Sequence, residues 1–382
     1  MILSTLYFTV NIFPQLKEIL LSTVYFTYPW YTLGINKENR MAKKVRIGMS
    51  GGVDSSVAAY ILKEQGYDVT GVTMRLCGNE AIDDAKSVAD KLGISFESRD
   101  CQKEFCAHVI EPFINTYEQG MTPNPCIECN KHIKFDLLTD GESLVATGHY
   151  ANIEFENNRF CLKKSCIVDK DQSYFLYSLS QDMLARIVFP IGNMSKAEVR
   201  QIAEEQGLLT AHKKDSQDIC FIEDGDYGKF IEEYKNKEYP NGNFVDTEGN
   251  ILGKHKGIIN YTIGQRKGLG LSLKKPMYVV KLDMERNEVV LDDNEALLKK
   301  ELTAGPFNWV SIDNPGKPFR ALGRIRYRHK ESPCTVTPNA DGTVSVLFDE
   351  TQRAITSGQS LVLYDIETDT YVLGGGPIGD VF

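Results

Sequence analysis

From residue 45 onward, short continuous apolar runs alternate with longer segments in which apolar residues recur at helical spacing. In the segment 55–65, for example, Val57, Ile61 and Leu62 share one face of a helix. Strands that alternate with helices form a parallel sheet with helices on both faces, so this part of the chain predicts an α/β domain. The predicted strands are 45–49, 68–74 and 94–98, and the predicted helices are 55–65, 80–92 and 104–118.

The pattern changes farther along the chain. A strand at 144–147 and a helix at 195–207 complete the α/β domain, whose expected limits are 41–220. Residues 221–274 are rich in glycine and mixed in pattern, and we expect a small central domain there. Evenly spaced short strands with turn residues between them predict a small all-β barrel over 275–382. Its predicted strands are 278–280, 288–291, 343–347 and 360–363.

The stretch between the first predicted strand and the first predicted helix is Ser50-Gly51-Gly52-Val53-Asp54-Ser55-Ser56. Adjacent glycines let the backbone approach an anion closely, serine hydroxyls donate hydrogen bonds, and the start of a helix presents unpaired N–H groups. This placement predicts a loop that binds nucleotide phosphates. The stretch lacks the lysine of G-x-x-x-x-G-K-[ST] and the spacing of G-x-G-x-x-G, which disfavours kinase and dehydrogenase chemistry. An ordinary tight turn is the alternative interpretation.

Chain length and charge limit the number of domains and the kinds of binding partner. The chain has 382 residues, which predicts two or three domains, and a net charge of −9, which argues against indiscriminate binding of nucleic acid. Locally, residues 254–275 hold six Lys and Arg residues and no acid, and Arg324, Arg326 and Arg328 alternate along a predicted strand. A basic face of this kind favours phosphate binding, and a solvated surface is the alternative.

The first forty residues differ from the rest, with clustered aromatic residues and no pattern that connects them to the predicted α/β domain. Lys17 and Glu18 interrupt the apolar stretch, which leaves less than the ~20 residues of a membrane-spanning helix. A signal peptide is not indicated, because the stretch has neither a basic segment before it nor a cleavage site of small residues. Met41-Ala42-Lys43-Lys44 has the character of a protein start. We therefore expect residues 1–40 to be an upstream extension, and we expect no membrane association.

Nine cysteines form an odd set without a disulfide framework, which favours a reducing cytoplasm. Cys129 and Cys220 lie in polar segments, Cys129 next to Lys131 and His132 near an expected helix start, and Cys220 after Lys213 and Lys214. A positive surrounding lowers the pKa of a thiol, so both are candidates for reactive thiols. Six of the others are expected to be small buried apolar residues. They are Cys77, Cys101, Cys106, Cys161, Cys166 and Cys334.

The spacing Cys126-x-x-Cys129 also permits a metal interpretation, because such a pair is half of a tetrahedral zinc site. No second CxxC or H-x-x-x-H follows it in the chain. We therefore expect no structural metal.

SGGVDSS resembles the PP-loop of the ATP pyrophosphatases, which split ATP into AMP and pyrophosphate while adenylating an oxygen of a second substrate. A longer match, over residues 43–376, resembles the bacterial tRNA-specific 2-thiouridylases. The matching strings are SGGVDSS, TPNPCIECNKHIKF, ATGHY, KDQSYFLY, KKDSQDICFI, YTIGQRKGLG and RYRHK. Adenylation turns the C2 oxygen of uracil into part of a good leaving group, so a phosphate loop and sulfur nucleophiles fit one reaction.

The resemblance implies ATP-dependent 2-thiolation of the wobble uridine of tRNA by sulfur from a cysteine persulfide. It implies that Cys220 carries the persulfide and that Cys129 is the nucleophile that releases sulfur, which leaves a transient Cys129–Cys220 disulfide. Asp54 is assigned to Mg²⁺ on the pyrophosphate from its charge alone, with helix capping as the alternative. The implied ATP contacts are Gly48, Met49, Ser50, Gly51, Gly52, Val53, Asp54, Ser55, Met74 and Gly148.

The resemblance also implies a set of tRNA contacts. Position 126 departs from the commonest family pattern, which has aspartate there, and Cys126 either competes with Cys129 for a disulfide or plays no part. A buried core histidine is the alternative interpretation of His149, and a core aromatic residue that of Tyr327. The implied tRNA contacts are Asn124, Pro125, Cys126, His149, Lys170, Asp171, Gln172, Arg326, Tyr327 and Gln359.

The expected partners are tRNA and a sulfur donor, either a cysteine desulfurase or a sulfur-relay protein, and the expected state is a cytoplasmic monomer. Two other functions are consistent with parts of the sequence. A PP-loop amidating ligase would need no paired thiols and no basic barrel. A non-catalytic tRNA-binding or metal-binding module would release neither AMP nor pyrophosphate.

Overall fold

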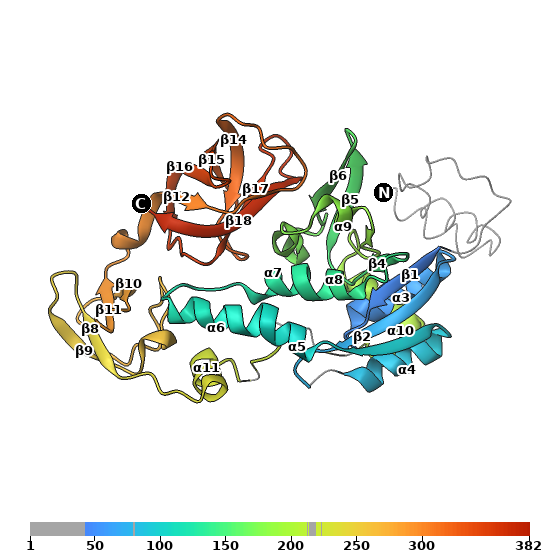
Figure 1. Ribbon diagram of the computed structural model, residues 1–382, viewed down its shortest axis with the longest axis horizontal. Helices are drawn as coiled ribbons and strands as arrows, with labels where there is room; N and C mark the ends of the chain where they lie inside the picture. Colours follow the sequence, from blue (N-terminus) through green and yellow to red (C-terminus); the bar gives the residue numbers. More distant parts are fainter. Residues whose placement is uncertain (1–42, 79–80, 212, 214–218, 223) are drawn as a thin grey trace, which may run out of the picture. The chain divides into compact units, whose positions relative to one another are not determined.

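The computed structural model describes residues 43–78, 81–211, 213, 219–222 and 224–382 (Figure 1). The expected parallel sheet is present. It has five strands, and every neighbouring pair is parallel. In spatial order the strands are β3 (Ser95–Asp100), β2 (Asp68–Arg75), β1 (Lys44–Gly48), β4 (Leu144–Ala146) and β7 (Ile187–Val188).

Helices α3 (Val53–Glu64), α4 (Ile82–Leu92) and α10 (Lys196–Glu205) bury their apolar faces in one core with β1. Their ends follow from the sequence. Gly93 adopts a left-handed conformation after α4, and Ser195 forms a capping box at the start of α10. The α/β fold predicted from the apolar pattern is thus confirmed.

Two helical segments contain wider turns in their middle. The first runs through α5 (Gln102–Phe105), a π-helical turn and α6 (Glu111–Glu118). The second runs through α7 (Pro125–Cys129), the π-helical turn Asn130–Lys134 and α8 (Phe135–Leu138). We expected this second helix to begin near Cys129, which is wrong. It begins at Pro125, because proline is well tolerated in the first turn of a helix, so Cys129 lies one turn inside.

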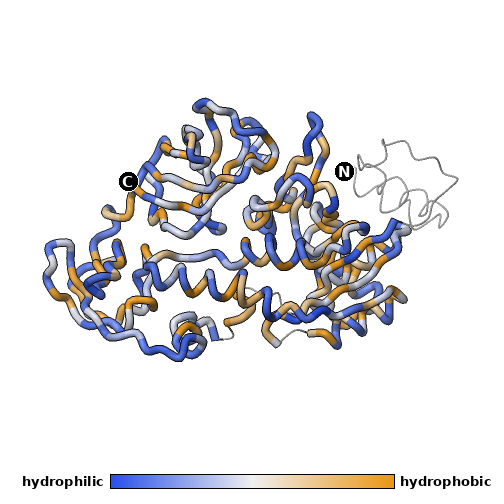
Figure 2. Tube along the Cα trace, in the orientation of Figure 1, coloured by the Kyte–Doolittle hydropathy of each residue, from blue (hydrophilic) through white to orange (hydrophobic). Residues whose placement is uncertain are grey.

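A hairpin follows β4 that the sequence pattern did not reveal. Strands β5 (Ala151–Glu156) and β6 (Arg159–Lys164) pair in antiparallel order around Asn157 and Asn158, both with positive φ. Asparagine is one of the residues that tolerates this conformation, and paired positive φ values are typical of tight hairpin turns. The tip of this hairpin is hydrophilic (Figure 2).

The central part of the chain consists of helix α11 (Tyr227–Lys235) and a four-stranded sheet. Two of its strands, β10 and β11, were expected in the C-terminal barrel, which is wrong. They pair with β8 and β9 instead, since β11 lies parallel to β8, a contact between distant segments that strand spacing does not reveal. The spatial order is β10 (Tyr278–Asp283), β11 (Glu288–Asp292), β8 (Gly242–Val245) and β9 (Ile251–His255).

The C-terminal part is the expected barrel. Its sheet closes because β12 pairs with β16 on one side and with β18 on the other. A separate apolar core fills it, including Val336, Phe348 and Leu361. In order around the sheet the strands are β12 (Leu298–Ala304), β16 (Val344–Arg353), β15 (Ser332–Pro338), β14 (Phe319–Arg324), β17 (Ser360–Tyr364), β18 (Val372–Val381) and β13 (Asn308–Trp309).

Residues 1–40, which we expected to be an upstream extension, lie outside the described residues. In the part of the chain that the structure describes, no helix has both the length and the apolar character that crossing a membrane requires. The rest of the chain, Ala42–Phe382, groups as one unit.

Candidate active site

The glycine loop follows β1 at the carboxyl edge of the parallel sheet, where ligands bind in folds of this class. Gly51 has φ +70°, and a Cβ there would lie 2.6 Å from the Cβ of Ala81. Only glycine fits this position without strain. The side-chain hydroxyl of Ser56 donates to the Gly52 carbonyl at 2.8 Å, so this serine stabilises the loop from inside. No side chain caps the start of α3, and uncapped N–H groups at a helix start are suited to binding an anion.

A second loop packs against the first at the end of β4. A Cβ on Gly148 would lie 2.8 Å from the Ser55 nitrogen, so glycine permits the close approach of the two loops. The neighbouring His149 is buried, and its Nδ1 lies 2.7 Å from the Thr147 hydroxyl oxygen. Burial holds the pKa of His149 well below its usual range, so the imidazole is neutral.

Asp54 is engaged by two partners. Its carboxylate accepts hydrogen bonds from Lys196 Nζ at 2.8 and 2.9 Å and from the Tyr150 hydroxyl at 2.8 Å. Both oxygens of this carboxylate therefore already have partners within the chain. Among the described residues, no group of three or more His, Cys, Asp or Glu side chains could hold a metal ion.

Sequence reasoning missed Lys196 and Tyr150. A signal for Lys196 exists, however. It is the first residue of α10, where the helix dipole disfavours a positive charge, and a lysine at this position indicates a nearby carboxylate. The pair links α10 to the start of α3 beside the loop.

Replacing Lys196 by methionine is expected to lower the free energy of unfolding by about 1–2 kcal/mol, because the charged hydrogen bonds to the partly buried Asp54 are lost. Urea denaturation followed by circular dichroism measures this loss. Lys86→Met is the matched control, since Lys86 forms an exposed ion pair with Asp90 at 2.9 Å. Equal denaturation midpoints for Lys196→Met and the control would contradict the structural role of the Asp54–Lys196 pair.

One cavity of about 1890 Å³ connects the glycine loop with the candidate thiols. All ten residues expected to contact ATP line it, and so do Cys129 and Cys220. The structure therefore brings together two thiols that lie 91 residues apart in the sequence (220 − 129). Seven of the ten expected tRNA contacts line the same cavity. They are Pro125, Cys126, His149, Lys170, Asp171, Gln172 and Tyr327.

Three of the six cysteines that were expected to be buried are not. Cys166 is exposed, and Cys77 and Cys106 are half-buried. Cys126, for which no burial was predicted, is exposed. Cys77 lines the cavity as well, and its Sγ lies 3.9 Å from the Cys220 carbonyl oxygen. Cys101, Cys161 and Cys334 are buried as predicted.

We expected positive neighbours to lower the pKa of Cys129 and Cys220, whereas in the structure both pKa values are raised. Burial raises the pKa of Cys129 to about 11, and desolvation by the surrounding residues raises that of Cys220 to about 11 although this cysteine is exposed. Lys213 does not act on Cys220, because it bonds to the Gly51 carbonyl and to Asp84. Lys214 lies outside the described residues. Both thiols are therefore protonated at neutral pH.

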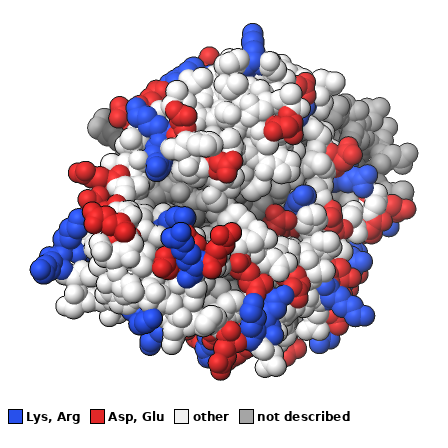
Figure 3. Space-filling view, turned by 60° about the vertical axis from the view of Figure 1, so that its left-hand side comes forward, with Lys and Arg blue, Asp and Glu red and all other residues white. Residues whose placement is uncertain are grey.

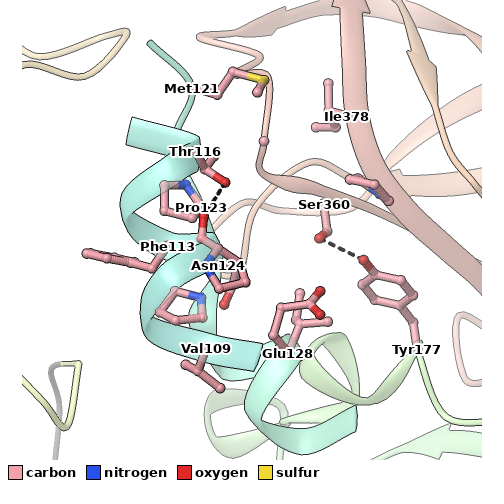
Figure 4. A pocket seen from close by; sticks show the side chains of 15 residues that line it. Val109, Phe113, Thr116, Met121, Pro123, Asn124, Glu128, Tyr177, Ser360 and Ile378 are labelled. Carbon is pink, nitrogen blue, oxygen red and sulfur yellow. Dashed lines mark hydrogen bonds between the residues drawn. The ribbon is translucent and has the colours of Figure 1, made fainter. Parts of the chain in front are cut away.

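Asn124 lies in a smaller cavity of about 250 Å³ beside the first (Figure 4). Pro125 lines both cavities, and Tyr177 and Ser360, joined by a hydrogen bond of 3.0 Å, form the opposite wall of the smaller one. Gln359, expected to contact tRNA, instead donates through Nε2 to the carbonyls of Thr122 and Pro123 at 3.1 Å. It holds the segment that leads into α7.

Other expected tRNA contacts also have internal partners. Asp171 is buried, and it accepts hydrogen bonds from the backbone of Ser165 and Ser173. The Gln172 side chain accepts from the Tyr150 N–H at 3.0 Å, next to the loop of His149. These two residues shape the cavity wall.

The three arginines at 324, 326 and 328 do not share a strand face, contrary to expectation. Strand β14 ends at Arg324, and a turn follows. Arg324 lies near Asp171 and Glu331, whereas Arg326 donates to the carbonyls of Arg353 and Ala354 at 3.4 Å. Tyr327 packs against Phe175 with ring centroids 4.4 Å apart. On the face shown in Figure 3, Lys and Arg alternate with Asp and Glu around a largely uncharged hollow.

Comparison with known proteins defines the class first. Three family models match consecutive parts of the chain: the tRNA methyl transferase HUP domain over residues 43–224, the tRNA methyl transferase PRC-barrel domain over 228–293, and the Aminomethyltransferase beta-barrel domain over 299–378. These limits agree with the sheets, since the PRC-barrel match includes β10 and β11. The chain is thus a three-part protein with a HUP domain.

Relatives narrow the class to a family. A protein of Clostridioides difficile named tRNA-specific 2-thiouridylase MnmA is 50% identical over 358 residues, which cover 88% of this chain and 98% of the relative. A protein of the same name from Acetivibrio thermocellus is 51% identical over 88% of this chain and 99% of the relative. The chain belongs to the tRNA-specific 2-thiouridylase family, as the sequence motifs predicted.

Proposed function

We propose that this protein replaces the C2 oxygen of the wobble uridine of tRNA with sulfur at the expense of ATP. The observation that carries the proposal is the single cavity onto which both the glycine loop and the thiols Cys129 and Cys220 open. Nucleotide activation and sulfur transfer act on the same carbon atom of the base, so their groups must share one space. The family membership supports the choice of substrate.

In the first step, the glycine loop binds the phosphates of ATP through the N–H groups at the start of α3. The C2 oxygen of the uracil attacks the α-phosphorus, pyrophosphate leaves, and the oxygen becomes bonded to AMP. The proposed nucleotide contacts are Gly48 to Ser55, Met74 and Gly148, all on the cavity wall. Magnesium enters with the nucleotide phosphates in this proposal, and Asp54 keeps its partners Lys196 and Tyr150.

In the second step, sulfur replaces the activated oxygen. Cys220 carries a persulfide, whose terminal sulfur bonds to C2 of the base while the bond between oxygen and C2 breaks and AMP leaves. The thiolate of Cys129 attacks the inner sulfur of Cys220, which breaks the persulfide bond and forms the Cys129–Cys220 disulfide. A cellular dithiol reductant restores both thiols for the next cycle.

In this proposal the ten expected tRNA contacts form three groups. Asn124, Pro125 and Cys126 line the cavities at the start of α7 and are proposed to contact the target base. Asp171, Gln172 and Gln359 act by holding the cavity wall, because their polar atoms bind other parts of the chain. The remaining proposed contacts are His149, Lys170, Arg326 and Tyr327.

We propose further that the protein acts in the cytoplasm as a monomer on one tRNA molecule. The sulfur donor is a cysteine desulfurase or a sulfur-relay protein in this proposal. Cys220 is suited to such an exchange because its side chain is exposed.

The test uses the full chain with unmodified tRNA, ATP, Mg²⁺ and a persulfide source. Mass spectrometry of the digested tRNA is expected to show 2-thiouridine only when ATP is present, with AMP and pyrophosphate formed in equal amounts. Release of AMP and pyrophosphate without any thiouridine would retain the nucleotide step but overturn the tRNA assignment. It would favour an amidating ligase.

A further inference from the structure

Lys134 is a half-buried lysine that lines the large cavity together with Cys126, Cys129 and Cys220. It makes no hydrogen bond or ion pair with any residue that the structure describes. Lysine side chains that lose contact with water normally acquire a partner, because burial penalises their charge. A cation without an internal partner on a cavity wall is available to a ligand or to the reacting groups.

The backbone explains how Lys134 comes to line the same cavity as the thiols. In a regular α-helix, five residues turn through about 500°, which would leave positions 129 and 134 about 140° apart around the axis. The turn Asn130–Lys134 is π-helical instead, and the Phe135 N–H donates to the Asn130 carbonyl five residues earlier. This wider turn moves positions five residues apart toward the same side of the helix. Turns of this kind occur frequently at functional sites.

The charge of Lys134 acts on three of the thiols that line the cavity. Burial raises the pKa of Cys126, Cys129 and Cys220, and Lys134 opposes this rise in all three. The thiols disfavour one another's ionisation. Cys126 and Cys77 raise the pKa of Cys129, and Cys129 and Cys126 raise the pKa of Cys220. His149, the other titratable group that faces Lys134, is held neutral by burial and by this lysine. No second cation compensates the sulfur charges among these groups.

We propose that Lys134 is the cation that holds the anionic sulfur of the reacting cysteines, namely the attacking thiolate of Cys129 and the persulfide of Cys220. The assignment of reacting thiols rests on the proposed function. The placement of Lys134 beside them does not depend on the substrate.

The test measures the alkylation rates of Cys129 and Cys220 by iodoacetamide in the full chain, across a series of pH values and without tRNA or ATP. Peptide mass spectrometry resolves the two sites. For Lys134→Gln the profiles are expected to shift to higher pH, because the thiolate loses its cation and the thiol pKa rises. At pH 8 the rate falls at least about threefold, since each unit of pKa changes the thiolate fraction about 10-fold.

Two variants control the experiment. Lys134→Arg keeps the charge and is expected to retain profiles close to those of the original protein. Lys131→Gln removes a charge from the same helical turn whose effect is on His132 and not on the thiols, so alkylation is expected to stay unchanged. An equal loss in Lys131→Gln and Lys134→Gln would overturn the assignment, and so would unchanged rates in Lys134→Gln.

The outcome also separates this inference from the proposed function. A shifted alkylation profile in a protein that makes no 2-thiouridine would support the role of Lys134 and overturn the thiolation proposal. Thiolation by Lys134→Gln with an unchanged rate and pH profile would support the function and overturn the role of Lys134.

Discussion

Replacing Cys220 by serine is expected to abolish 2-thiouridine formation, and Cys129→Ser is expected to do the same. A serine hydroxyl cannot carry a persulfide and cannot form the disulfide that releases sulfur. We expect each rate to fall at least about 1000-fold, as loss of a covalent nucleophile does in other enzymes. The measurement is the amount of thiouridine per enzyme after mass spectrometry of digested tRNA.

The two variants should stop at different points of the reaction. Cys129→Ser still accepts sulfur on Cys220 and is expected to accumulate a persulfide there, visible as one added sulfur atom on the intact protein. Cys220→Ser accepts none at this position. If both variants accumulated the same persulfide, Cys220 would not be the acceptor, and the order of sulfur transfer would have to be reversed or replaced.

Serine variants of Cys166 and Cys126 provide controls for this test. Cys166 is exposed and lines the same cavity, with its Sγ 3.5 Å from the Asn193 carbonyl oxygen, so Cys166→Ser controls for loss of an accessible thiol. Cys166→Ser is expected to retain full thiolation.

Cys126→Ser decides whether Cys126 competes with Cys129 for the disulfide or plays no part, which the sequence left open. Thiolation lost in Cys126→Ser but kept in Cys129→Ser would make Cys126 the nucleophile.

The raised pKa values of Cys129 and Cys220 mean that the reactivity of both thiols should increase as the pH rises above neutral. Both values lie near 11, so the thiolate fraction of each cysteine increases from neutral pH toward that value. The sequence had suggested a lowered pKa for Cys129, because Lys131 and His132 lie two and three residues after it. Neighbours in sequence point elsewhere on the helix, whereas Lys134, five residues away, shares the cavity with the thiol. Burial and facing side chains decided the pKa of Cys129, and neither is visible in a local window of sequence.

Local pattern was sufficient for the α/β part of the fold. Strands such as 45–49 and helices such as 80–92 were predicted nearly to the residue, because their apolar period and the terminal Gly93 are local signals. The hairpin at Asn157 and Asn158 was missed although its turn residues are a recognisable signal.

Contacts between distant segments were not predictable in the same way. β11 pairs with β8 some 45 residues earlier along the chain, as in the pairing of Val290 with Val245, and no feature of either strand specifies its partner. The same holds for Asp54 and Lys196, which lie 142 residues apart. The thiols Cys129 and Cys220 were paired by resemblance to a family, and the structure brings both to one cavity. Predicting which residues work together over long stretches of sequence therefore required either the fold or the family.

Replacing Gly51 by alanine is expected to lower the formation of AMP and pyrophosphate about 100-fold, because displacement of a reacting group by about 1 Å can have an effect of this size. The new methyl group would lie 2.6 Å from the Cβ of Ala81 and 2.7 Å from its carbonyl oxygen. The backbone at Ala81 leads into α4 and gives way less easily than a flexible side chain, so the glycine loop itself has to move. Pyrophosphate release in the complete reaction mixture measures the effect.

A matched control separates loop displacement from backbone strain. Gly66 has φ +82° just after α3, and a Cβ there would meet nothing within 4 Å. Alanine at either position has to adopt a left-handed conformation at a cost of about 1–2 kcal/mol, so both variants should lose similar stability in thermal unfolding. Only Gly51→Ala places an atom against a neighbour. Gly66→Ala should therefore keep its rate of pyrophosphate release, and a comparable loss in both variants would mean that global strain, not the shape of the loop, limits catalysis.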